Sequence, residues 1–361
     1  MTATNMGAMA IVVQSRLRAA SAPWRVVFLA RMLADPKVLP VANRFSPSPV
    51  SARIVVVGSS NTDMVVRVPT LPRPGETVIG GTFFTARGGK GANQAVAAAR
   101  AGGSVALVAN LGDDTLGDET LAALAAEGIA VDQVRRVADT RSGVALILVD
   151  EWGENSIAVA PGANALLAPE QIDEVAEGLS PDDVLLVQLE TPLESVLAAA
   201  RTASRAGARL ILNPAPAREL PDELLALVSV LTPNESEAVR LAGVQMGGQE
   251  ELDAAATALL RRGVGAVVIT LGAGGAYVAT TEVRETIPTY RVEARDTTGA
   301  GDVFNGALAV ALAERMPFAD AVRFANAAAA ISVTRDGAQP AAPYRAEILE
   351  LLEIEHAERH A

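Results

Sequence analysis

The chain has 361 residues, half of them apolar, and a formal net charge of −12. This length accommodates one large α/β domain or two smaller ones. The acidic balance argues against non-specific nucleic-acid binding and against an anionic membrane surface. No apolar run reaches the roughly eighteen residues that a membrane-spanning helix needs. Cysteine is absent, which excludes disulfides, thiol nucleophiles and Cys-based metal sites and is compatible with a cytoplasmic protein.

Histidine is almost absent as well. The only two, His356 and His360, lie at the extreme C-terminus. We therefore expect neither histidine catalysis nor a histidine-based metal site. Any divalent metal should be held by oxygen, the ligand that Mg²⁺ prefers.

Residues 1–52 differ from the rest of the chain. Residues 1–53 contain seven basic residues and one acid, and several prolines precede residue 50. An Arg-rich, acid-poor leader is also the composition of a targeting peptide. Because no clear cleavage pattern or apolar region is present, we expect a disordered extension or the product of an upstream start codon. A single domain is predicted to follow, over residues 53–361.

Strands alternate with helices in this domain. Apolar runs predict strands at 53–58, 104–110, 184–189, 208–212, 228–231 and 266–270, and apolar periodicity predicts helices at 90–101, 114–127 and 192–205. This alternation is typical of a three-layer α/β sandwich, with a central, mostly parallel sheet flanked by helices. Short strands at 64–68 and 77–79, and a hairpin at 144–150 and 155–159, predict a second, small β-sheet from about 61–86 and 141–160.

Polar side chains follow the predicted strands. Parallel strands bring their carboxyl ends to one edge of the sheet, where open α/β sheets bind ligands. Each of these residues could serve as a loop or cap residue alone, but together they indicate a site. They are Asn61, Asp63, Glu190, Asn213, Asn234 and Thr270.

The stretch Gly88-Gly89-Lys90-Gly91-Ala92-Asn93 leads into an alanine-rich helix. It is not a Walker A loop, because G-x-x-x-x-G-K-[ST] is absent. Its glycines allow close backbone approach, and Lys90 and Asn93 can donate hydrogen bonds to hydroxyls. The structural alternative is a tightly packed helix start.

The stretch Asp296-Thr297-Thr298-Gly299-Ala300-Gly301-Asp302 reads as a tight loop feeding a helix, with Asp302 in the first turn. Free N–H groups at a helix N-terminus suit a phosphate, and the glycines let it approach. We predict that Gly299, Ala300 and Gly301 form an anion hole, while Asp302 accepts a proton from a hydroxyl. The alternative is a plain helix cap.

Two further stretches are candidates for nucleotide and metal binding. Asn234 and Glu237 have the spacing of a capping box, which is a full structural explanation. The functional alternative is that both face phosphates and organise Mg²⁺ through water. The glycine-rich turn from Thr270 to Gly275 suits nucleotide contact or a simple turn between strands.

These stretches together resemble the ribokinase family of carbohydrate kinases, also called the PfkB family. The resemblance runs from about Ile54 to Pro343. Its two main motifs are residues 88–93 and 296–302, and the supporting stretches, such as 58–63, 213–217 and 337–340, are most similar to the ribose-phosphorylating members. Residues 1–53 have no counterpart in those members. Ala341 stands where many have a serine that helps the K⁺ site, and Asn326 stands where some have a histidine near adenine.

The resemblance implies a reaction and roles for individual residues. The reaction is ATP-dependent phosphorylation of D-ribose at its 5-hydroxyl, with Asp302 as the base. The small sheet would form a lid over the sugar and the interface of a homodimer. The implied sugar ligands are Asn61, Asp63, Gly88, Gly89, Lys90, Gly91, Asn93 and Glu190. ATP would meet Asn234, Thr270, Gly272, Gly275, Gly301 and Asn326. Glu237 would support Mg²⁺, and Asp296, Thr298, Ser332, Arg335 and Gly337 would hold K⁺.

Two alternatives remain open. One is a kinase of the same family that acts on another sugar or on a nucleoside. A nucleoside site needs groups that stack a base, and the chain has only 3% aromatic residues. The other is a sugar-binding protein without catalysis, although pure binding has no need of a base such as Asp302.

Overall fold

The computed structural model describes residues 52–176, 178–244 and 249–359. The chain divides into one unit of residues 47–348, which holds both β-sheets, and a second of residues 1–46 and 349–361. Of the second unit, only residues 349–359 are described. The predicted N-terminal extension lies outside the described residues, apart from Ala52.

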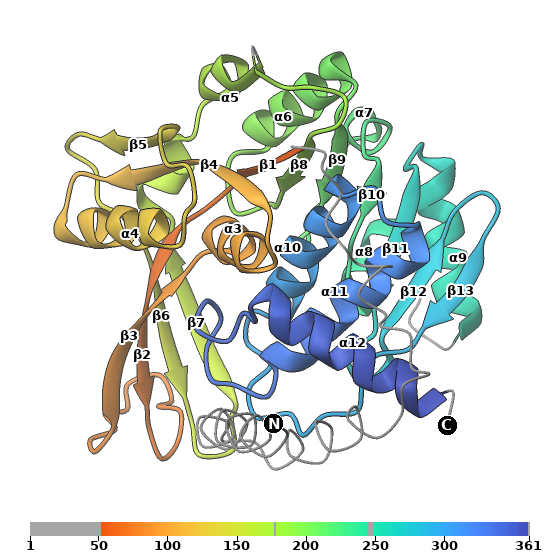
Figure 1. Ribbon diagram of the computed structural model, residues 1–361. Helices are drawn as coiled ribbons and strands as arrows, with labels where there is room; N and C mark the ends of the chain where they lie inside the picture. Colours follow the sequence, from red (N-terminus) through yellow and green to blue (C-terminus); the bar gives the residue numbers. More distant parts are fainter. Residues whose placement is uncertain (1–51, 177, 245–248, 360–361) are drawn as a thin grey trace, which may run out of the picture. The chain divides into compact units, whose positions relative to one another are not determined.

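The described residues form two sheets and the helices around them (Figure 1). The strands are β1 (Arg53–Val57), β2 (Asn61–Arg67), β3 (Thr82–Gly88), β4 (Ser104–Gly112), β5 (Val134–Val137), β6 (Gly143–Val149), β7 (Asn155–Ala160), β8 (Val184–Val187), β9 (Arg209–Leu212), β10 (Val230–Leu231), β11 (Ala266–Thr270), β12 (Ala276–Ala279) and β13 (Arg284–Ile287). The α-helices are α3 (Lys90–Arg100), α4 (Thr115–Ala126), α5 (Pro169–Ala176), α6 (Leu193–Ala206), α7 (Asp222–Leu225), α8 (Glu235–Ala242), α9 (Gln249–Arg261), α10 (Ala300–Ala313), α11 (Phe318–Ser332) and α12 (Arg345–Arg359), and short 3-10 turns span Gly162–Leu166 and Gly272–Gly274.

The main sheet confirms the predicted α/β architecture. Within the described residues it has nine strands in the order β13-β12-β11-β10-β9-β8-β1-β4-β5. Neighbours from β11 through β5 pair in parallel, and β12 is antiparallel to both β11 and β13. Strand β1 lies between β4 and β8, so the chain reverses its direction of travel across the sheet at β1.

Helices cover both faces of this sheet, which makes the three predicted layers. Helices α3 and α10 contact β1 on one face, whereas α6, α8 and α9 contact strands β8 to β12 on the other. Because both faces are covered, the strands read as continuous apolar runs rather than as alternating ones. In β1, for example, Ile54 to Val57 are all at most 2% exposed.

The small sheet consists of strands β3, β2, β6 and β7, in that order. The predicted strand at 77–79 is wrong: these residues form no strand, and the return strand is β3. Positive φ angles at Gly75 and Gly80 break up the intervening segment. Asn61 and Asp63, predicted to lie in a loop, belong to β2 instead.

The topology predicts a ligand site near the carboxyl end of β1. Strand β1 pairs with β4 on one side and with β8 on the other, so the order of the strands reverses there. Open α/β sheets bind ligands in the crevice at such a switch point. Strand β2 of the small sheet begins only a few residues after β1 ends. No helix in the described part of the chain is long and apolar enough to cross a membrane.

Candidate active site

The loop before α10 confirms the predicted helix start, with Asp302 in the first turn. Gly299 is the N-cap, with a left-handed φ of 72°. A Cβ there would lie 2.6 Å from the Cβ of Ala338, whereas a Cβ on Gly301 would meet nothing within 4 Å. Glycine at 299 is therefore required by backbone and packing. At 301 the missing side chain leaves open space in front of the helix.

The first turn of α10 offers free backbone donors. Among the described residues, the N–H groups of Gly299, Gly301 and Asp302 have no hydrogen-bond acceptor. The N–H of Ala300 instead donates to the carbonyl of Thr297 at 3.2 Å. Unpaired N–H groups and the helix dipole favour an anion at this point. Of the three amides predicted to form the anion hole, that of Ala300 is already engaged.

Asp302 is held by two side-chain amides of α3. Asn93 Nδ2 donates to Asp302 Oδ2 and Gln94 Nε2 donates to Asp302 Oδ1, both at 2.9 Å. Burial raises the pKa of Asp302 above its ordinary value, and Lys90 and these two hydrogen bonds oppose that rise. A buried carboxylate with increased proton affinity is suited to general-base chemistry.

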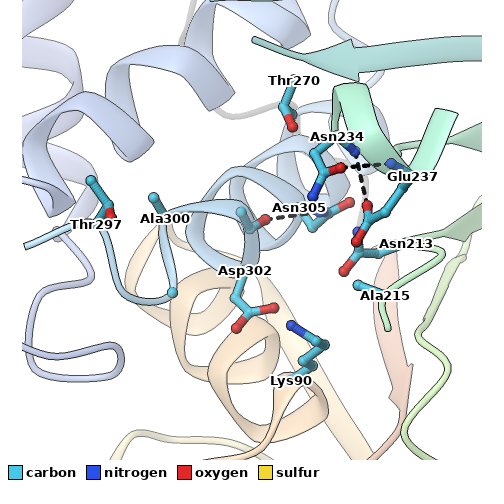
Figure 2. Close-up of a pocket in the computed structure, with 12 residues that line it drawn as sticks. Lys90, Asn213, Ala215, Asn234, Glu237, Thr270, Thr297, Ala300, Asp302 and Asn305 are labelled. Atoms are coloured by element: carbon cyan, nitrogen blue, oxygen red, sulfur yellow. Dashed lines mark hydrogen bonds between the residues drawn. The ribbon is translucent and has the colours of Figure 1, made fainter. Parts of the chain in front are cut away.

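Lys90, the first residue of α3, lies near Asp302 in Figure 2. Burial alone would lower the pKa of Lys90, but the charges of Asp302, Glu190 and Glu237 outweigh it and raise the pKa. Lys90 therefore stays charged. Its positive charge partly offsets the negative charges of Asp302, Glu190 and Glu237.

These groups line one pocket, shown in Figure 2. The sequence-predicted residues that line it are Lys90, Asn213, Asn234, Glu237, Thr270, Gly299, Ala300, Gly301 and Asp302. The other predicted residues are not part of its lining, namely Asn61, Asp63, Gly88, Gly89, Gly91, Asn93, Glu190, Gly272, Gly275, Asp296, Thr298, Asn326, Ser332, Arg335 and Gly337.

The start of α3 packs directly on the connection between β1 and β2. A Cβ on Gly89, whose φ is 85°, would lie 2.6 Å from the backbone N of Asn61. A Cβ on Gly91 would lie 2.6 Å from the backbone N of Ser59. The glycines of this motif therefore have a structural role, which is to let the helix start approach the end of β1.

The predicted sugar ligands gather beside this contact. Glu190 Oε2 accepts hydrogen bonds from Ser59 Oγ at 2.5 Å and from the N–H of Lys90 at 2.9 Å. Asn61 Oδ1 accepts one from Asn164 Nδ2 at 2.8 Å. Glu190 is thus hydrogen-bonded to the start of α3, and Asn61 packs against Gly89, the residue that precedes this helix.

Asp63 belongs to the same cluster of acids. Burial, Glu190 and Asp302 raise the pKa of Asp63 to about 6. Gly88 leaves room for this side chain, since a Cβ there would lie 2.2 Å from Asp63 Oδ2. Like charges close together in a buried place compete for ionisation. Asp63 therefore keeps its proton to a higher pH than a solvated aspartate does.

Helix α8 begins with the predicted capping box. Asn234 Oδ1 accepts from the N–H of Glu237 at 2.8 Å, and Glu237 Oε2 accepts from the N–H of Asn234 at 2.9 Å. Both residues also line the pocket, so the structural and functional readings are compatible. Burial raises the pKa of Glu237 above its ordinary value.

Asp296 joins two loops that are far apart in the sequence. Its Oδ1 accepts from the N–H of Thr298 at 2.9 Å and its Oδ2 from the N–H of Gly337 at 2.8 Å. Burial alone would raise the pKa of Asp296, but hydrogen bonds from Thr298 and Gly337 outweigh it and lower the pKa. Asp296 therefore stays ionised and holds residues 296–299 against residues 333–337.

Of three residues that are predicted to contact ATP but do not line the pocket, two have structural contacts of their own. Gly275, with a φ of 90°, lies so close to the end of β13 that a Cβ would be 2.2 Å from the carbonyl of Ile287. Asn326 is buried, and its Nδ2 donates to that same carbonyl at 3.1 Å. Gly272, in contrast, has open space at its Cβ position.

Several residues of the site were not predicted. Gln94 contacts Asp302, and its only sequence signal is its place directly after Asn93 in the glycine-rich motif. Asn305 lines the pocket and its Nδ2 donates to the carbonyl of Gly301 at 2.8 Å, a spacing of four that a helical reading could have found. Asn164 and Gln188 have no such signal, because their partners are remote in sequence.

The sequence matches the profile described as pfkB family carbohydrate kinase over residues 51–345. A protein named ribokinase from Haemophilus influenzae is 45% identical over 300 residues, which cover 83% of this chain and 98% of that protein.

Solved structures agree with this match. A ribokinase from Thermotoga maritima is 39% identical with a TM-score of 0.76, and covers 83% of this chain and 99% of its own. An Arabidopsis thaliana ribokinase complexed with ribose and ATP is 33% identical with a TM-score of 0.78, covering 84% of this chain and 99% of its own.

Proposed function

Because the chain belongs to the pfkB family of carbohydrate kinases, we propose that it transfers the terminal phosphoryl group of ATP to the 5-hydroxyl of D-ribose. Similarity to several proteins named ribokinase supports the choice of ribose. The observation that carries the proposal is the pocket itself. It combines a buried carboxylate, Asp302, with the free amides of the same helix turn and with Lys90.

The sugar is proposed to lie at the cluster beside β2 and the start of α3. Carboxylates and side-chain amides together can accept from and donate to several hydroxyls. The proposed ligands are Asn61, Asp63, Gly88, Gly89, Lys90, Gly91, Asn93 and Glu190.

In the proposed reaction, Asp302 accepts the proton of the 5-hydroxyl as that oxygen bonds to the γ-phosphorus. The bond from phosphorus to the bridging oxygen breaks, and ADP leaves with that electron pair. The N–H groups of Gly299 and Gly301, together with that of Asp302, stabilise the charge on the transferring group. Ala300 contributes less, because its N–H donates to Thr297.

ATP is proposed to bind along the part of the pocket lined by Asn234, Thr270 and Gly301 and to extend beyond it. The residues assigned to it are Asn234, Thr270, Gly272, Gly275, Gly301 and Asn326. Asn234, Thr270 and Gly301 line the pocket, which supports their assignment to the phosphates.

The pocket suits a magnesium ion near Glu237. One oxygen of this carboxylate accepts from the backbone of Asn234, and the other is left for a water of the ion. Mg²⁺ commonly keeps its waters and needs only one or two carboxylates. When bound, it would neutralise phosphate charge.

The loop at Asp296 suits a monovalent cation. Among the described residues, the carbonyls of Thr298, Arg335 and Gly337 accept no hydrogen bond, so they are available as ligands. The carbonyl of Ser332 is shared with the N–H of Arg335 at 3.0 Å. Bound there, K⁺ would hold residues 296–299 in position without contacting the substrates.

A kinase of the same family with another acceptor is the main alternative. The proposed sugar cluster is rich in hydrogen-bonding groups and poor in aromatic ones, which favours a sugar over a nucleoside. A binding protein without catalysis is disfavoured by the buried, raised-pKa carboxylate of Asp302 beside free amides.

One assay tests the proposal. ATP consumption is measured with ribose, deoxyribose, fructose, fructose phosphate and adenosine, in the presence and absence of K⁺. We expect ribose to be the preferred acceptor, with K⁺-stimulated turnover. Preference for another acceptor would overturn the assignment of ribose.

The variant Asp302→Asn tests the mechanism. We expect it to bind ribose but to lose roughly a hundredfold to ten-thousandfold in kcat, the usual contribution of a general base. Wild-type turnover by this variant would rule out the role of Asp302.

We further propose a homodimer formed through the small sheet, which would act as the lid of the sugar site. Because the proposed reaction uses ATP, we place the protein in the cytoplasm.

A further inference from the structure

We propose that Gln94 is a positioning residue for the general base. It holds the Asp302 carboxylate in one orientation, and a chain of buried amides that ends on a backbone carbonyl orients Gln94 in turn. This inference rests on the proposed function, because it concerns the proton transfer to Asp302.

Gln94 is fully buried, and every hydrogen-bonding group of its side chain is used. Its Nε2 donates to Asp302 Oδ1 at 2.9 Å and to Asn213 Oδ1 at 3.1 Å. Its Oε1 accepts from Gln188 Nε2 at 2.6 Å. An amide has two N–H donors, so both are engaged. Burying an amide is costly unless it is hydrogen-bonded. Here one bond holds the Asp302 carboxylate, and the other two hold the Gln94 amide itself in place.

The direction of these bonds is set from outside Gln94. Asn213 Nδ2 donates to the carbonyl of Thr232 at 3.0 Å, and a backbone carbonyl can only accept. Asn213 must therefore turn its oxygen toward Gln94. On the other side, Gln188 Nε2 donates to Gln94 Oε1, but Gln188 Oε1 has no partner among the described residues, so Asn213 is the residue that sets the direction. The Gln94 amide cannot flip without breaking these bonds, so Asp302 always meets an N–H donor.

Gln94 differs in this respect from Asn93, the other amide on Asp302. Asn93 is among the proposed sugar ligands, so substrate can compete for its side chain. Gln94 is 0% exposed and cannot touch substrate. It is therefore the partner of Asp302 whose contact stays the same before and after ribose binds.

A neutral donor at this place has a specific electrostatic effect. The charged groups that face Asp302 are Lys90, which favours its ionised form, and the acids Asp63, Glu190 and Glu237, which oppose it. The Gln94 N–H stabilises the ionised form without adding a charge. It also fixes the rotation of the carboxylate, so that its free lone pairs face the pocket.

The test uses Gln94→Met, which keeps the volume but removes the donor, and Gln94→Glu, which keeps the shape but offers only an acceptor when ionised. We expect kcat to fall about 10- to 100-fold, as when an outer partner of an active group is lost. The KM values for ribose and ATP should stay within about threefold. The acidic limb of the kcat/KM profile should move to higher pH, because Asp302 loses a donor to its ionised form.

A second arm separates positioning from stability. Introduced into Asp302→Asn, the Gln94→Met change should alter the remaining turnover by less than about twofold, because residues that act as a unit are not additive. Gln171→Met is the matched control. Gln171 is another buried glutamine, and its Nε2 donates to Asn110 Oδ1 at 2.8 Å away from the pocket. We expect it to lose thermal stability but to keep wild-type kcat and pH profile.

Ribose binding by calorimetry identifies variants that remain folded, and Gln94→Glu carries the test if the methionine variant does not fold. The proposal is overturned if a folded Gln94 variant keeps the wild-type kcat and pH profile. It is equally overturned if Gln94→Met slows Asp302→Asn by the same factor as the wild type. Failure of the proposed function gives a different result, namely undiminished turnover by Asp302→Asn alone.

Discussion

At the scale of single residues, the two glycines at the start of α10 differ in whether the fold leaves room for a side chain. A Cβ on Gly301 meets only open space, although that space is where the transferring phosphate is proposed to lie. We predict that Gly301→Ala raises the free energy of unfolding by up to about 0.5 kcal/mol, since alanine restricts the unfolded chain. It should nevertheless lower kcat by at least about tenfold through misplacement of the phosphate. Thermal melts and steady-state kinetics measure the two effects.

Gly299→Ala is the control for that prediction. Its Cβ would collide with Ala338, and its φ of 72° disfavours any side chain. This variant should lose stability as well as activity. If Gly301→Ala also melts earlier than the wild type, its loss of activity cannot be assigned to the phosphate site.

Asp63 is predicted to make sugar binding dependent on pH. Its pKa in the folded protein is raised to about 6, so below that pH it is protonated, loses its negative charge and has one oxygen that donates instead of accepting. We expect ribose affinity, measured by calorimetry, to fall as the pH drops through 6. In Asp63→Asn the affinity should be low at every pH, with a flatter dependence. An unchanged dependence would assign the titration to another group.

The same shift affects stability with a defined sign. Because the folded-state pKa of Asp63 lies above its unfolded value, the folded state retains this proton while the unfolded state loses it, and stability falls as pH rises from about 4 to about 6. Above that window the destabilisation is constant. Asp63→Asn should therefore melt higher than the wild type at about pH 7, with little difference near pH 4.

At the scale of elements, Glu237 in the first turn of helix α8 has a structural role and a proposed functional role, and two variants can distinguish them. Glu237 both closes the capping box and is proposed to hold a water of Mg²⁺. We predict that Glu237→Gln keeps the box, because the glutamine oxygen can still accept from the N–H of Asn234. The Mg²⁺ concentration for half-maximal activity should rise about tenfold or more. Thermal melts and a Mg²⁺ titration of activity measure the two roles.

Glu237→Ala is the comparison, since it removes the box as well and should lower the free energy of unfolding by about 1 kcal/mol. If both variants lose stability equally while the Mg²⁺ response is unchanged, Glu237 is a cap alone.

The elements that could be predicted are those whose signal is local. The apolar run of β1 and the glycine entry of α3 each identify their element within a few residues. Strand β13 is exposed along most of its length, and its place depends on pairing with β12, so its own residues carry no pattern. Strand β3 follows a Pro- and Gly-rich segment, and the pairing with β2 rather than local propensity decides where it begins.

At the scale of the whole molecule, the site depends on contacts between distant parts of the chain. The position of the proposed base, Asp302, beside free backbone amides at the start of α10 could be predicted, because all of these groups lie within one short motif. The amide chain through Gln188, Gln94 and Asn213 could not, because three strands or helices must be placed before those side chains meet. Asp296 likewise reaches Gly337 only through the fold.

The small sheet exposes an apolar surface that no described residue of this chain covers. Ile157 and Val159 are each 55% exposed and Phe84 is 42% exposed. The register of the strands places these three side chains on one face of the sheet. Register places Val159 beside Ala145, which lies beside Asp63, so these three residues share one face of the sheet. A second copy on that face would bury the apolar residues and lie next to the proposed sugar site.

We therefore predict that Ile157→Lys with Val159→Lys converts a dimer into monomers, because placing two charges in an apolar interface is costly. Light scattering should then give the mass of one chain, and the KM for ribose should rise because the partner no longer helps to enclose the sugar. Val283→Lys, an exposed apolar position between β12 and β13, is the control and should remain dimeric. A wild-type protein that is already monomeric would overturn the proposed dimer, and a double variant that stays dimeric would place the association on another surface.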